Sequence, residues 1–270
     1  MRHCLVNKLV IGGEAPIRLM GVINCSPESF YSDSYVPTDA VYAKAVEMTE
    51  QGADLVDIGA RSTAPHAQAI SGAEEASRME AALAQMDGSG IPVSVDTLNP
   101  GVLEVCLRHD IHAVNDISGL LSPVYAQLVA DSGLPAFLMA SQRQPGDAVG
   151  VGQTIAALHA VVDRCESFGI REYVLDPGVG LWTPLRSPEN DWELCQNFDQ
   201  FSVFDRPLLA AVSRKSFIGN LINREPVDRL AGSLAVTIML LQKGARVVRA
   251  HDVPQTSDVI RVYLRMAGLQ

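Results

Sequence analysis

The feature that most constrains this chain is an alternation of short apolar runs with longer amphipathic segments, which continues almost from end to end. The segments between the runs span about 10 to 18 residues and have helical spacing, as at Ala40, Ala43 and Val46. Strands that alternate with helices in this way predict a (β/α)8 TIM barrel, with a doubly wound open sheet as the alternative. The strand-like runs are 19–24, 54–59, 92–96, 112–117, 136–140, 173–176, 208–212 and 245–250.

Glycine and proline mark the element boundaries that this interpretation requires. Glycine closes five helical segments just before a strand, as a left-handed helix end favours: Gly52, Gly90, Gly133, Gly169 and Gly244. Proline follows a capping residue at three predicted helix starts: Asn99-Pro100, Ser122-Pro123 and Ser187-Pro188. The leading stretch 4–17 predicts a short N-terminal hairpin centred on Gly12-Gly13. No linker or composition break interrupts the pattern, so residues 1–270 are predicted to form one domain.

Composition excludes several classes of protein. Hydrophobic residues make up 47% of the chain and charged residues 19%, which is typical of a globular protein and not of a disordered one. The formal net charge of −10 argues against a nucleic-acid or anionic-membrane surface. No run of about 18 apolar residues suggests a membrane span, and the N-terminus has no signal-like apolar region, so we expect a cytoplasmic protein. The five cysteines are scattered without metal-binding spacing and are expected to be buried thiols.

In a TIM barrel the chemistry lies at the carboxyl ends of the strands, and here those ends carry polar side chains. Carboxylates in apolar strands need partners or a ligand, so the ring favours a functional site, although Asp116 and Asp252 could instead cap the following helices. In strand order, the predicted ring consists of Asn24, Ser26, Arg61, Ser62, Thr63, Asp96, Asn115, Asp116, Met139, Asp176, Ser213, Arg214, Lys215, Ser216, Arg249, His251 and Asp252.

The members of the ring suggest a ligand with two ends. Carboxylate and amide groups at Asp96, Asn115 and Asp176 can grip a planar heterocycle, with Met139 packed on its face. A basic rim, formed by Lys215, Arg249 and His251 with Arg61 and Arg214 nearby, suits phosphate. A solvated basic turn is the alternative explanation for S-R-K-S at 213–216. Asn24 and a phosphate could share a Mg²⁺ ion.

These strand ends resemble those of dihydropteroate synthases and the wider pterin-binding barrels. The motifs, in chain order, are G-V-I-N-C-S-P-E-S-F, D-I-G-A-R-S-T-A-P, S-V-D-T, N-D-I-S-G, L-D-P-G-V-G, S-R-K-S-F-I-G and R-A-H-D-V. The resemblance implies condensation of 6-hydroxymethyl-7,8-dihydropterin pyrophosphate with an arylamine, release of pyrophosphate, and a homodimer. By motif position, Asp96, Asp176 and Lys215 would be catalytic.

The resemblance also assigns binding roles. Asp96, Asn115, Asp176 and Lys215 would hold the pterin, and Met139 would line its pocket. Asn24 would contact Mg²⁺ and pyrophosphate, while Arg249 and His251 would anchor pyrophosphate. Thr63, Ser216 and Arg61 complete the predicted substrate-binding set.

Two departures from the family pattern fall where the arylamine binds. Ala64 replaces the usual arginine, with Arg61 three residues earlier, and Leu181-Trp182-Thr183 replaces the usual Phe-Gly-Lys. The acceptor could therefore be p-aminobenzoate or the ribofuranosyl-aminobenzene phosphate of the methanopterin-type branch. Arg61 would bind that extra phosphate, or form a salt bridge with Glu74 or Glu75. The alternatives are a corrinoid-linked pterin methyltransferase and a pterin-binding protein that has lost catalysis.

Overall fold

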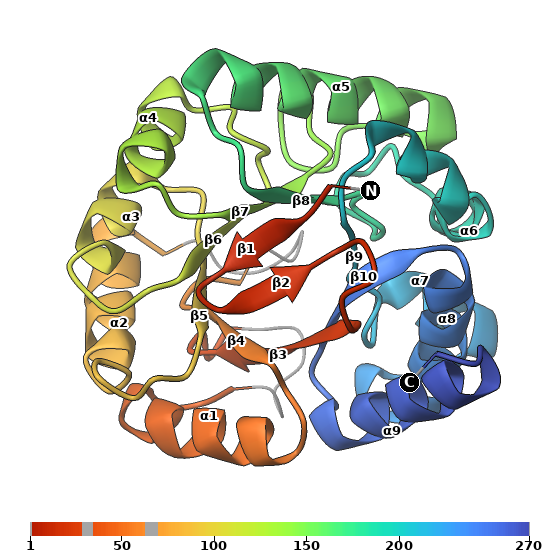
Figure 1. Ribbon diagram of the computed structural model, residues 1–270, viewed down its shortest axis with the longest axis horizontal. Helices are drawn as coiled ribbons and strands as arrows, with labels where there is room; N and C mark the ends of the chain where they lie inside the picture. The colour runs from red at the N-terminus through yellow and green to blue at the C-terminus, as the bar shows by residue number, and fades with distance from the viewer. Residues whose placement is uncertain (1, 29–34, 63–69, 270) are drawn as a thin grey trace.

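The structure, a computed structural model, describes residues 2–28, 35–62 and 70–269 and contains a closed barrel of eight parallel strands (Figure 1). The strands are hydrogen-bonded around the barrel in the order β10-β3-β4-β5-β6-β7-β8-β9. This closure confirms the predicted TIM barrel and excludes the open sheet. The barrel strands are β3 (Arg18–Asn24), β4 (Leu55–Gly59), β5 (Val93–Asp96), β6 (Ala113–Asp116), β7 (Ala136–Met139), β8 (Tyr173–Asp176), β9 (Leu208–Ala210) and β10 (Ala245–Ala250).

Helices surround the barrel on its outside, as the view along the barrel shows (Figure 1). None of the helices in the described residues is long and apolar enough to cross a membrane. The α-helices of the described chain are α1 (Val41–Glu50), α2 (Gly72–Leu83), α3 (Pro100–Cys106), α4 (Pro123–Ser132), α5 (Gly150–Phe168), α6 (Pro188–Gln196), α7 (Ser216–Ile222), α8 (Leu230–Gln242) and α9 (Val253–Met266). Short 3-10 helices are η2 (Thr38–Ala40), η3 (Phe198–Phe204) and η4 (Pro226–Asp228).

The helix boundaries follow the local sequence signals. Asn99 precedes Pro100, and its side chain accepts a hydrogen bond from the Gly101 amide at 3.0 Å, so α3 begins where the sequence predicts. All five glycines predicted at the ends of helical segments have positive φ, as at Gly133 (66°) and Gly169 (72°).

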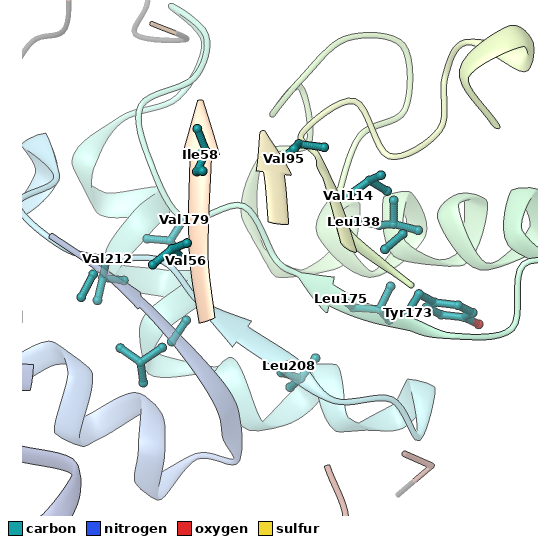
Figure 2. Close-up of a cluster of buried hydrophobic side chains, with 14 of the residues drawn as sticks. Val56, Ile58, Val95, Val114, Leu138, Tyr173, Leu175, Val179, Leu208 and Val212 are labelled. Atoms are coloured by element: carbon teal, nitrogen blue, oxygen red, sulfur yellow. The ribbon is translucent and has the colours of Figure 1, made fainter. Parts of the chain in front are cut away.

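The barrel wall separates two apolar layers because successive side chains of a strand point to opposite faces. Side chains such as Val56, Ile58 and Leu138 point outward and belong to the larger core between strands and helices (Figure 2). Met20 and Leu55 belong to a second apolar cluster inside the barrel. Both faces of each strand are therefore buried, as is usual for parallel sheets covered by helices.

A short antiparallel hairpin, β1 (Cys4–Val6) and β2 (Leu9–Ile11), lies across one end of the barrel (Figure 1). Its side chains Cys4, Val6 and Ile11 are buried in the same cluster as the barrel interior. The hairpin itself was predicted, but its predicted centre was wrong. Residues 7 and 8 join the two strands, and Asn7 takes the positive φ (53°) of the turn. Gly12 follows β2, where an added Cβ would lie 2.7 Å from Cγ of Pro207.

Candidate active site

The carboxyl ends of the strands bring most of the predicted site residues to one mouth of the barrel. Asn24 ends β3, Asp96 ends β5, Met139 ends β7 and Asp176 ends β8, while Asn115 is the penultimate residue of β6. On each strand, the side chain two residues earlier also lies at a level of the barrel where side chains point inward. Because side chains alternate between the two faces of a strand, these five side chains point inward as well.

A hydrogen-bonded network of charged and amide groups lies below this mouth. Asp57 Oδ2 accepts from Arg249 Nε at 2.6 Å and from Asn115 Nδ2 at 2.8 Å. Arg249 Nη2 donates to Asp96 Oδ2 at 2.9 Å. Asp57 is a site residue that was not predicted from the sequence, although an acid in the apolar strand L-V-D-I-G was a signal for it. The sequence predicted that the acidic and basic groups lie on separate rims of the site. The structure differs, because Arg249 is hydrogen-bonded directly to the carboxylates of Asp57 and Asp96.

Burial and neighbouring charges shift the titration of both acids at the mouth. Burial raises the pKa of Asp96 to about 7, and the Arg249 guanidinium opposes part of that rise. Burial likewise raises the pKa of Asp176, against the nearby Lys215 ammonium and a 2.7 Å hydrogen bond from the Gly178 amide. A cation beside either carboxylate therefore lowers its pKa and favours its ionised form.

Lys215 follows β9, next to the strand that carries Asp176, and lies immediately before α7. Its Nζ donates to the carbonyl of Val179 and lies 5.0 Å from the centroid of the Trp182 ring. Burial lowers the pKa of this ammonium to about 8, although Asp176 and Asp191 act in the other direction. Gly180 has φ of 145°, and a Cβ there would lie 3.3 Å from Lys215 Nζ. The glycines of D-P-G-V-G thus allow the backbone to approach the lysine closely.

His251 follows β10 and contributes less positive charge than the sequence suggested. Its backbone amide and its ring Nδ1 both lie 3.2 Å from Ser213 Oγ. Burial, reinforced by the cations Arg249, Arg214 and Lys215, lowers the pKa of His251 to about 3. The imidazole is therefore neutral at physiological pH and can offer hydrogen bonds without a formal charge.

Arg214 is not part of the basic rim. Its guanidinium forms two bonds with Asp252, Nη2 to Oδ1 at 2.5 Å and Nε to Oδ2 at 2.8 Å. Its Nη1 donates to the carbonyls of Pro226 and Val227 at 2.8 and 2.7 Å. Arg214 thus ties the loop after β9 to η4 and to the start of α9. Asp116, the last residue of β6, holds the loop that follows, because its carboxylate accepts the amide hydrogens of Ser118 and Leu120, each at 2.7 Å.

The arylamine side of the predicted site is described in part. Arg61 Nη1 lies 3.9 Å from Glu75 Oε2, which is the salt bridge that the sequence offered as the alternative to a phosphate contact. Glu75 is buried in α2 and accepts the Thr97 hydroxyl at 2.6 Å. Ser216 is exposed as the first residue of α7. Thr63 and Ala64 lie outside the described residues.

Asn24, the residue predicted to contact a metal ion, ends β3 at the mouth. The described residues contain no group of three or more His, Cys, Asp or Glu side chains that could hold a metal. Asn24 instead supplies one neutral amide oxygen, which accepts from the Ser26 amide at 3.1 Å. A single oxygen ligand fits Mg²⁺ that takes its other ligands from phosphate and water.

Comparison with known proteins agrees with this geometry. Residues 20–251 match the family model described as pterin binding enzyme. The dihydropteroate synthase of Escherichia coli K12 is 34% identical over 259 residues, covering 90% of this chain and 89% of that protein. A Xanthomonas albilineans dihydropteroate synthase with 4-aminobenzoic acid has a TM-score of 0.83 at 32% identity, with 99% of both chains covered.

The same X. albilineans enzyme in complex with 7,8-dihydropteroate has a TM-score of 0.84 at 28% identity, with both chains fully covered (100%). The family match spans most of the barrel and ends at His251, in the last of the strand-end motifs. The chain therefore belongs to the pterin-binding enzyme family and is a transferase of its dihydropteroate synthase group.

Proposed function

We propose that this barrel joins 6-hydroxymethyl-7,8-dihydropterin pyrophosphate to p-aminobenzoate and releases pyrophosphate. The observation that carries the proposal is the convergence of Asp96, Asn115 and Asp176 with the Lys215 ammonium at one mouth of a pterin-family barrel. Carboxylate and amide oxygens suit the N–H groups of a pterin, and an ammonium suits its ring acceptors. Met139, buried beneath Gly178, would close the pocket against the ring face.

The proposed reaction proceeds by departure of pyrophosphate before the amine attacks. The bond between the pterin methylene carbon and the pyrophosphate oxygen breaks, and its electron pair leaves with pyrophosphate. The positive charge left on the methylene and ring lies near Asp96 and Asp176, whose carboxylates would stabilise it. The amine nitrogen then forms the new C–N bond and loses a proton to solvent. The reaction needs no covalent protein intermediate.

The leaving pyrophosphate would lie at the outer part of the mouth. His251 and Arg249 would donate hydrogen bonds to it, with Arg249 still held by Asp57. Asn24 Oδ1 would hold a Mg²⁺ ion, which would supply countercharge to the leaving group.

We favour p-aminobenzoate as acceptor over a phosphorylated arylamine. Arg61, the cation that would bind an added phosphate, already has the buried Glu75 carboxylate beside it. One solved relative, the X. albilineans enzyme, holds 4-aminobenzoic acid. Ser216, exposed at the start of α7, would contact the acceptor carboxylate.

We further propose a cytoplasmic homodimer. The face formed by α7, α8 and α9 exposes large apolar side chains that a second copy could cover: Leu221, Met239, Val262 and Met266. All five cysteines lie in described residues and are buried as unpaired thiols, which suits a reducing compartment.

The proposal is tested by incubating the purified protein with dihydropterin pyrophosphate, p-aminobenzoate and Mg²⁺ and measuring pyrophosphate and dihydropteroate. We expect turnover, and Lys215→Ala should lower kcat/KM by about a hundredfold or more. Lys243→Ala is the matched control, because Lys243 pairs with Asp199 on the surface, and this variant should keep wild-type activity.

Other outcomes point to other functions. Turnover only with ribofuranosyl-aminobenzene phosphate would reassign the acceptor. If the protein binds the pterin substrate but releases no pyrophosphate from it, whichever amine is added, the result would instead favour the methyltransferase or the inactive binding protein.

A further inference from the structure

Asp57 is a fully buried carboxylate one layer below the mouth of the barrel. It lies in the middle of β4, with no exposed surface (0%), between its register neighbours Val22 on β3 and Ser94 on β5. Its Oδ2 accepts the hydrogen bonds from Asn115 and Arg249, whereas Oδ1 is buried with no partner among the described residues. A carboxylate desolvated and only half satisfied is costly, so a purely stabilising role explains it poorly.

The carboxylate fixes the orientation of the Asn115 side chain. An ionised carboxylate only accepts hydrogen bonds, so Asn115 must turn its Nδ2 toward Asp57, as the 2.8 Å contact shows. The amide oxygen Oδ1 then faces away from Asp57. The two residues come from β4 and β6, and the contact passes across β5.

The same carboxylate oxygen also orients Arg249. Asp57 holds Nε at 2.6 Å while Asp96 holds Nη2 at 2.9 Å, so the guanidinium is clamped by β4 and β5, which lie two and three strands from its own strand β10 around the barrel. Asp57 therefore orients two side chains, Asn115 and Arg249, that would contact the substrate, although Asp57 itself would not contact it.

We propose that Asp57 is a positioning residue that sets the hydrogen-bonding pattern of the pocket, by presenting Asn115 as an acceptor. Together with the Asp96 and Asp176 carboxylates, Asn115 then offers acceptors only. These three side chains form the floor of the pocket. A floor of acceptors selects a heterocycle that carries adjacent N–H donors, as a pterin does along its 2-amino-4-oxo edge. It disfavours a 2-oxo ring, whose carbonyl would face an acceptor. The inference rests on the proposed function, because it takes the pterin to bind at this floor.

The test compares the Kd values of 6-hydroxymethylpterin and 6-hydroxymethyllumazine, which differ in the 2-amino and 2-oxo groups, by calorimetry on the same protein. Wild type should prefer the pterin. In Asp57→Ala, and in Asp57→Ser should the first variant fold poorly, Asn115 can turn its Nδ2 to the ligand. The ratio of the two Kd values should then fall by about tenfold, the equivalent of one hydrogen bond.

Two variants separate orientation from packing. Asp57→Asn should retain the preference, since its amide oxygen can accept from both Asn115 and Arg249. Ser94→Ala should also retain it, because Ser94 is the register neighbour of Asp57 and its hydroxyl has no partner among the described residues. A general loss of packing would weaken both ligands equally and would not change the ratio.

An unchanged ratio in folded Asp57→Ala or Asp57→Ser, with wild type still preferring the pterin, would overturn the role of Asp57 alone. Wild type that binds neither heterocycle would overturn the proposed function together with this inference. A reduced ratio in Asp57→Ala that Asp57→Asn restores supports the inference.

Discussion

At the scale of residues, the cations around the mouth differ in how firmly they hold their charge. Arg249 is permanently ionised and paired with two carboxylates, whereas the pKa of Lys215 is about 8 and that of His251 about 3. At neutral pH the positive charge at the mouth is therefore carried by Arg249 and mostly by Lys215, and not by His251.

Binding of a pyrophosphate ligand should draw protons into the site. A nearby anion favours the charged forms of Lys215 and His251, so their pKa values rise and the complex takes up protons from solution at about pH 8. Calorimetry in buffers of different ionisation enthalpy measures this uptake, which should be about half a proton from a lysine near its pKa.

Lys215→Arg provides the comparison for that experiment, because an arginine stays charged at this pH and should reduce the uptake. Binding enthalpies that agree in every buffer would contradict the expected coupling.

Which residues the sequence could identify depends on how deep they lie. Asp96 and Asp176 end their strands, so the barrel topology alone predicted them at the mouth. Asp57 lies mid-strand, and both faces of a parallel strand are apolar, so alternation did not reveal that its side chain points inward. Its partners Asn115 and Arg249 are distant in sequence and meet it only after the barrel closes.

At the scale of elements, Arg214 shows a similar limit of sequence reasoning. Strand and helix boundaries followed from apolar runs, glycines and prolines, which are local signals. Arg214 looked like a ligand-binding cation because its partner Asp252 lies 38 positions away. The structure makes it a brace between the β9–α7 loop, η4 and α9, and its own φ is 58°.

Removing this brace should destabilise the protein. Arg214→Met leaves Asp252 without its cation and should lower the free energy of unfolding by about 3 kcal/mol, as for other buried ion pairs that lose one partner. Chemical denaturation measures the change. Arg143→Met, at an exposed position, should stay within about 0.5 kcal/mol of wild type, and an equal loss in both variants would refute the brace.

At the scale of the whole molecule, the hairpin and the strand ends divide the barrel between stability and chemistry. β1 and β2 seal one end with apolar side chains, while the polar network occupies the other. The sequence predicted this division only in outline, because it gave a hairpin but not the surface that the hairpin covers.

A charge introduced into the hairpin should therefore affect stability far more than substrate affinity. Val6→Asp buries a carboxylate in the barrel interior and should cost about 3 kcal/mol or more, with KM values close to wild type at temperatures where the variant is folded. The neighbouring Leu5 is 50% exposed, so Leu5→Asp should be nearly neutral in thermal denaturation. Equal destabilisation by the two changes would show that the hairpin does not seal the barrel.

The pairing of β10 with β3 has a consequence for how the chain matures. During synthesis, one edge of β3 stays uncovered until residues 245–250 have been made. At ordinary elongation rates this interval is on the order of tens of seconds. During that time the nascent sheet exposes unpaired backbone groups to other chains. Closure of the ring must therefore follow synthesis of the chain through residue 250, and until then the two edges of the nascent sheet stay open.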